Sequence, residues 1–122
     1  MPTRQFVCVI DDDESMRESL VGLLGSEGLR AVAYASAEAF LASDDLTAAA
    51  FLIIDVSMPE MSGPQLQDVL IERGVTTPHV FVSAHADGVI RRRVLERGAV
   101  AYFVKPFDED ELLATMRGVL GA

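Results

Sequence analysis

The hydrophobic positions of this chain fall into short apolar runs separated by stretches with helical spacing. The runs are rich in Val, Ile, Phe and Tyr, and several are apolar at consecutive positions, which is typical of strands buried on both faces. We therefore predict strands at Phe6–Ile10, Leu29–Ala35, Ala50–Ile54, His79–Val82 and Val100–Val104.

Between these strands, Leu, Val and Met recur at the three- and four-residue intervals of an amphipathic helix. Such stripes begin at Met16, Leu66 and Leu112, and shorter patterns predict helices at Ser36–Ser43 and Asp87–Leu95. Glycines suited to ending helices and residues suited to starting them lie at the matching boundaries. They are Gly28, Gly74 and Gly98 for the ends, and Ser36, Pro64 and Asp108 for the starts.

Five strands that alternate with five helices predict an α/β fold, in which a doubly wound, five-stranded parallel sheet has helices on both faces. Right-handed crossovers place the first and last helices on one side and the other three on the opposite side, as a three-layer sandwich. The strand order 2-1-3-4-5 fits this arrangement. Functional residues are then expected beyond the carboxyl ends of the first and third strands, where the order reverses.

Composition narrows the class of protein further. The chain has 122 residues, enough for one domain over residues 1–122, and a net charge of −9 argues against direct contact with nucleic acid. The single cysteine, Cys8, excludes an internal disulfide and lies in an apolar run. No run approaches the ~18 apolar residues of a membrane span. Because residues 1–5 also lack the form of a signal peptide, we expect a cytoplasmic protein without membrane contact.

Acidic residues follow the two strands that flank the expected crevice. Asp11, Asp12 and Asp13 come after the first strand, and Asp55 comes directly after the third. At least three carboxylates should therefore converge, and their repulsion is relieved by a hard divalent cation, Mg²⁺ or Mn²⁺. For Asp13, a second interpretation is the N-cap of the first helix.

Two further side chains point to chemistry at the same edge. Ser83 follows the fourth strand, and Lys105, the only lysine beside nine arginines, follows the fifth. A metal ion, a hydroxyl and an ammonium around one carboxylate suit a phosphoryl group, with Asp55 as the attacking nucleophile. No histidine is required for this step: His79 is interpreted as structural, and the role of His85 is left open.

Four segments with these residues resemble the response-regulator receiver domain of two-component signalling, which has a CheY-like (flavodoxin-like) fold. They are Ile10–Asp13, Ile54–Gly63, Val82–Ala84 and Phe103–Phe107. The resemblance covers essentially the whole chain. Among receivers, the sequence looks most like those of the FixJ/NarL type. It implies a phosphoacceptor signalling domain, which promotes only its own phosphorylation and dephosphorylation, rather than an enzyme.

The resemblance also implies the roles of individual residues. Asp55 would accept the phosphoryl group of a sensor histidine kinase. Asp12, Asp55 and the backbone carbonyl of Ser57 would bind Mg²⁺ directly, and Asp11 would bind it through water. Ser83 would move toward the phosphoryl group, and Tyr102 would turn inward as the second switch residue. The Lys105–Pro106 peptide bond is expected to be cis.

Partners follow from the same resemblance. The surface formed by the fourth helix, fifth strand and fifth helix is expected to control an output partner or a homodimer. Arg91, Arg92, Arg93 and Arg97 would face the acidic segment Asp108–Glu111, with charges exchanged between protomers. An output domain beyond Ala122 is a further expectation.

Three other interpretations stay open at this point. Asp11 to Ser15 imitates the nucleophile motif of haloacid-dehalogenase-type phosphohydrolases, which would make Asp11 the nucleophile. A receiver-like scaffold could bind partners without being phosphorylated. A flavin-binding module has similar topology, but three aspartates after the first strand would repel its phosphate.

Overall fold

Strands and helices alternate along the chain in the computed structural model, which describes residues 5–121. The strands are β1 (Phe6–Ile10), β2 (Arg30–Tyr34), β3 (Phe51–Asp55), β4 (His79–Ser83) and β5 (Ala101–Val104). The helices are α1 (Glu14–Ser26), α2 (Ala37–Leu41), α3 (Gly63–Glu72), α4 (Gly88–Glu96) and α5 (Glu109–Leu120), with a 3-10 helix η1 (Asp44–Leu46) after α2. Predictions about residues 1–4 and Ala122 lie outside the described residues.

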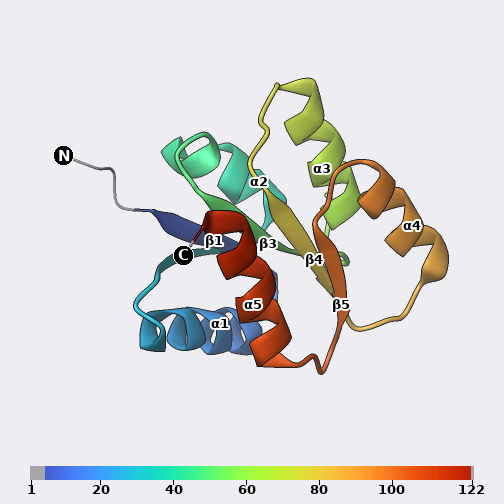
Figure 1. The fold of residues 1–122 in the computed structure, drawn as a ribbon. Coiled ribbons are helices and arrows are strands. Elements are labelled where there is room, and N and C mark those ends of the chain that lie inside the picture. Colours follow the sequence, from blue (N-terminus) through green and yellow to red (C-terminus); the bar gives the residue numbers. More distant parts are fainter. Residues whose placement is uncertain (1–4, 122) are drawn as a thin grey trace.

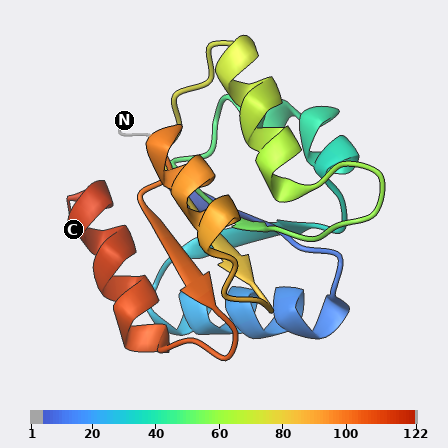
Figure 2. The same cartoon turned by 90° about the vertical axis from the view of Figure 1, so that its right-hand side faces the viewer.

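The strands form one parallel sheet in the order β2-β1-β3-β4-β5, so the predicted fold class is confirmed. Figure 1 shows α1 and α5 on one side of the sheet and α2, α3 and α4 on the other, and the view in Figure 2 agrees. The three central strands are buried along their whole length, whereas the edge strands β2 and β5 are partly exposed. Consecutive apolar positions therefore identified the strands that are covered on both faces.

Alternate side chains of the central strands pack into two apolar clusters, one on each face of the sheet. Cys8, Leu52 and Phe81 pack with α2, α3 and α4, whereas Val9 and Ile53 pack with α1 and α5. The Cys8 side chain is fully buried, and burial, followed by the charge of Asp45, raises the pKa of its thiol to about 12. Cys8 is therefore an inert core residue.

The predicted boundary residues act as expected. Side-chain oxygens of Ser36 and Asp108 accept backbone N–H groups at the starts of α2 and α5. The three glycines predicted to end helices all have positive φ. At α3 a capping box of Ser62 and Gln65 adds to the predicted proline start. None of the described helices is long and apolar enough to cross a membrane.

Candidate functional site

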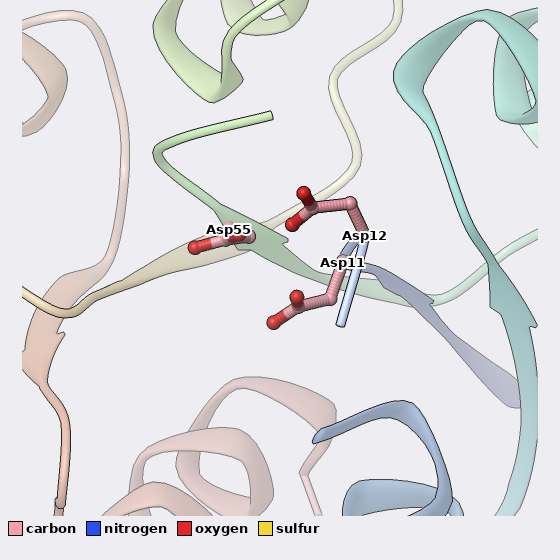
Figure 3. A group of neighbouring side chains, drawn as sticks. All are labelled: Asp11, Asp12 and Asp55. Atoms are coloured by element: carbon pink, nitrogen blue, oxygen red, sulfur yellow. The ribbon is translucent and has the colours of Figure 1, made fainter. Parts of the chain in front are cut away.

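The acidic cluster lies where β1 and β3 end side by side. The register pairs Ile10 with Ile54, so Asp11 and Asp55 follow neighbouring positions of adjacent parallel strands. One carboxylate oxygen from each of Asp11, Asp12 and Asp55 lies within 4.8 Å of the other two, and Figure 3 shows the three side chains together. The sheet thus brings together acids that are more than forty residues apart in the sequence.

The three consecutive aspartates have different environments. Asp11 is 1% exposed, and its Oδ1 accepts the backbone N–H of Asp13 at 2.9 Å. Asp12 is exposed and turns its carboxylate toward Asp55 (Figure 3). Asp13 caps α1 by accepting the N–H groups of Ser15 and Met16, so the interpretation of Asp13 as an N-cap is confirmed.

Lys105, the residue directly after β5, supplies a positive charge to the acidic cluster. Its Nζ lies 3.2 Å from Asp11 Oδ2 and 3.5 Å from Asp55 Oδ1. Burial acts to lower the pKa of Lys105, but attraction to Asp11 and Asp55 outweighs burial and leaves the pKa raised above its usual 10.5. The ammonium therefore stays charged beside the two buried carboxylates.

One ammonium does not balance three carboxylates. Burial and then the neighbouring Asp11 raise the pKa of Asp55 from 3.8 to about 7, although Lys105 acts in the opposite direction. The cluster therefore favours additional positive charge, and its donors are the hard oxygens that Mg²⁺ and Mn²⁺ prefer over softer metals. On both grounds the residues fit a divalent cation.

The raised pKa of Asp55 predicts a pH-dependent stability in metal-free buffer. Because folded Asp55 holds its proton more tightly than unfolded Asp55, its stabilising contribution is complete below pH 3.8 and is lost as the pH rises through about 7. We expect Asp55→Asn to gain about 2 kcal/mol of unfolding free energy over the unmodified chain on going from about pH 5 to about pH 8. Urea denaturation of both chains with EDTA measures this difference, and parallel pH profiles would contradict it.

Hydrogen bonds link Ser83 at the end of β4, His85 in the segment after it, and Tyr102 within β5. Ser83 is 3% exposed, and its Oγ accepts the backbone N–H of His85 at 3.1 Å. The Tyr102 hydroxyl donates to the backbone carbonyl of His85 at 2.9 Å. One peptide segment therefore connects the buried hydroxyl beside the acidic cluster to a half-exposed aromatic ring on the edge strand.

A surface cavity of about 510 Å³ opens beside the acidic cluster, between Asp12, the loop that follows β3 and Ile90 of α4. Ser57 and Met58 line it. The cavity therefore connects the acidic cluster to solvent.

Gly63, the first residue of α3, supports this loop. A side chain at Gly63 would place its Cβ 2.4 Å from the backbone oxygen of Asp55 and 3.0 Å from the Cα of Val56. The Gly63 N–H also donates to the Val56 carbonyl at 2.8 Å. The sequence places Gly63 in a motif without revealing its role, because only the fold shows that the helix start lies against the end of β3.

The other site predictions have mixed outcomes. The Lys105–Pro106 peptide bond is cis, as expected. Within the domain, Arg93 and Arg97 pair with Asp68 of α3, and the described residues show no ion pair between these arginines and Asp108–Glu111. Helices α3 and α4 lie side by side, which brings Asp68 close to the two arginines. Exchange of charges between protomers stays a prediction.

Comparisons with known proteins agree with the fold and with the acidic cluster described above. The family model described as "Response regulator receiver domain" matches residues 7–117. The chain belongs to this family. As a receiver domain it is 40% identical over 114 residues to response regulator protein TmoT of Ectopseudomonas mendocina, across 93% of this chain and 52% of TmoT. It is 36% identical over 121 residues to transcriptional regulatory protein FixJ of Azorhizobium caulinodans, across 99% of this chain and 57% of FixJ.

Solved structures support the same assignment. The structure of response regulator StyR matches the receiver domain with a TM-score of 0.90 and 35% identity, over 98% of this chain and 60% of StyR. The crystal structure of FixJ-N matches with a TM-score of 0.85 and 29% identity, over 98% of this chain and 94% of that one. The receiver domain thus spans about half the length of the curated relatives it matches, and it is part of two-component signalling.

Proposed function

We propose that this receiver domain accepts a phosphoryl group on Asp55 from the phosphohistidine of a sensor histidine kinase. The observation that carries the proposal is the ion pairing of Lys105 with Asp11 and Asp55 inside the acidic cluster. An isolated acidic cluster is common on protein surfaces, but a buried carboxylate held beside the chain's only lysine is arranged for charge that arrives during a reaction.

The proposed step is an in-line displacement at phosphorus. A carboxylate oxygen of Asp55 forms the new bond to phosphorus while the bond from phosphorus to the donor nitrogen breaks, and the bonding electrons leave with the imidazole. Ionised Asp55 is already a nucleophile, so no general base is required. Lys105 then pairs with a phosphoryl oxygen, and Ser83 donates its hydroxyl to another.

Asp12 and Asp55, through their carboxylates, and Ser57, through its backbone carbonyl, would hold the divalent cation, with Asp11 acting through water. When bound, Mg²⁺ supplies positive charge that offsets the phosphoryl oxygens, and Mn²⁺ could take its place. Asp11 keeps Lys105 oriented toward the cluster, because its Oδ2 is the nearer of the two carboxylate partners of Nζ.

Phosphorylation is proposed to change the surface formed by α4, β5 and α5. If Ser83 turns toward the phosphoryl group, its Oγ leaves the His85 N–H, and the segment whose carbonyl holds Tyr102 is free to move. Tyr102 would then turn inward and alter the exposed face. This is a population shift between two states of one surface.

The proposed partners follow from this surface. It would control an output partner or a homodimer, and an output domain beyond Ala122 is proposed because relatives of about twice the length are named transcriptional regulators. We propose that residues 1–122 form the receiver domain, that it acts in the cytoplasm as a signalling domain rather than an enzyme, and that it makes no direct contact with nucleic acid.

Incubation of the full chain with a small acyl phosphate tests the proposal. With Mg²⁺, we expect intact mass spectrometry to show one added phosphoryl group, and peptide mapping to place it on Asp55. With EDTA in place of Mg²⁺, the added mass should be absent. No added mass under either condition would favour the scaffold that binds partners without phosphorylation.

A further inference from the structure

Two adjacent residues of α3, Gln67 and Asp68, contact the C-terminal part of α4 and the residue after it. Asp68 pairs through Oδ2 with Arg93 at 2.6 Å and through Oδ1 with Arg97 at 2.8 Å. The neighbouring Gln67 donates from Nε2 to the backbone carbonyl of Val94 at 3.0 Å. The ion pairs are partly exposed, whereas the Gln67 side chain is fully buried. Solvent therefore weakens the buried Gln67 hydrogen bond less than it weakens the ion pairs.

Gln67 also contacts His79, the first residue of β4. Gln67 Nε2 lies 2.9 Å from His79 Nε2, and the other ring nitrogen, Nδ1, lies 3.2 Å from the backbone oxygen of Thr77. The two hydrogens of the amide nitrogen thus serve the Val94 carbonyl and the His79 ring. This arrangement requires a neutral ring with its proton on Nδ1, donating to Thr77, and with Nε2 as an acceptor.

A protonated His79 is incompatible with this arrangement. Its Nε2 would then carry a hydrogen directed at the hydrogens of the Gln67 amide nitrogen. If the Gln67 amide turned over, Oε1 could accept from His79, and Oε1 has no hydrogen-bond partner within residues 5–121. The same oxygen would, however, then face the Val94 carbonyl, and two acceptors repel. Gln67 can satisfy protonated His79 or the backbone of α4, but not both.

We propose that His79, Gln67 and Val94 form a pH-sensitive latch, in which protonation of His79 releases α4 from α3. This inference goes beyond the proposed phosphoryl transfer and requires no phosphorylated residue. Its consequence for signalling does rest on the proposed function, since α4 belongs to the proposed output surface.

The surroundings of His79 determine the pH at which its ring takes up a proton and the latch opens. A cavity of about 390 Å³ is lined by His79 and Arg97 and gives protons access to the ring. Arg97, the residue after α4, is paired with Asp68 of α3, while β3 presents the apolar Leu52 and β4 the ring of Phe81. Burial, opposed by the Thr77 carbonyl, lowers the pKa of His79 below 6.5. The latch is therefore closed at neutral pH and opens in acid.

Amide hydrogen exchange on the full, unphosphorylated chain tests the latch. We expect the protection factors of residues 94–99 to fall about fivefold, the factor for one net hydrogen bond, between about pH 7.5 and about pH 5, in step with the His79 ring signals in NMR. In His79→Val, which suits a strand start, this pH-dependent loss should disappear. Other titrating groups are common to both chains, so the difference isolates His79.

Two variants of α3 separate the latch from the ion pairs. Gln67→Met keeps the length of the side chain without its donors, and it should lower protection of α4 at every pH. Asp68→Asn should also lower protection at every pH, but the pH-dependent part should remain. The proposal is overturned if His79→Val keeps the same pH-dependent loss, if the His79 ring does not titrate before the chain unfolds, or if Gln67→Met leaves α4 unchanged.

Discussion

Asp55→Asn is expected to reduce phosphoryl uptake from an acyl phosphate to an undetectable level. Asparagine keeps the shape of the side chain but has no carboxylate oxygen to attack phosphorus. The alternative nucleophile, Asp11, is poorly placed for attack, because its two oxygens are engaged by Lys105 and by the Asp13 N–H. Intact mass after a fixed time with excess donor and Mg²⁺ measures the uptake.

Two further substitutions complete this experiment. Asp11→Asn should slow uptake without abolishing it, because it weakens the orientation of Lys105 and leaves Asp55 in place. Asp44→Asn, at an exposed position in η1, removes the same charge and should leave uptake unchanged. Uptake that survives in Asp55→Asn and disappears in Asp11→Asn would instead favour the phosphohydrolase-like interpretation.

Gly63→Ala is expected to destabilise the chain by about 2–3 kcal/mol, the cost of overpacking where the neighbours cannot yield. The new Cβ would lie 2.4 Å from the backbone oxygen of Asp55, and backbone at the end of a buried strand moves less readily than a flexible side chain. Any relief shifts Asp55 or the start of α3, so phosphoryl uptake should slow as well. Urea denaturation and the uptake assay measure the two effects.

Gly22→Ala provides the matched control. Gly22 lies within α1, and a Cβ there would have no heavy atom within 4 Å. Alanine should therefore stabilise the chain by up to about 1 kcal/mol through helix propensity alone. Equal effects of the two substitutions would mean that the close approach of α3 to Asp55 is not what constrains position 63.

The sheet and most of the site were predictable because both depend on local signals in the sequence. Runs such as Phe51–Ile54 are apolar at every position, and this pattern arises when helices cover both faces of a strand. Asp55 and Lys105 then stand out as charged residues at strand ends, and parallel topology places strand ends together. Once the strands were predicted, the meeting of these residues followed from the topology.

Contacts between helices were not predictable in the same way. Gln67 lies between apolar positions of α3, and a polar residue at such a position is ordinarily assigned to the exposed face, yet its side chain is fully buried. Its burial depends on acceptors supplied by His79 and Val94, which are 12 and 27 residues away. The pairing of Asp68 with α4 likewise depends on the angle at which two helices pack, and no local pattern encodes that angle.

The single lysine has a practical consequence for chemical labelling. Lys105 carries the only side-chain amine in residues 1–122, the group with which amine-directed acylating reagents react. Its contacts with Asp11 and Asp55 keep the amine protonated and therefore slow to react. The extent of acylation at this one side chain consequently reports how tightly the acidic residues hold it, and it allows variants or added ions to be compared at a single labelled position.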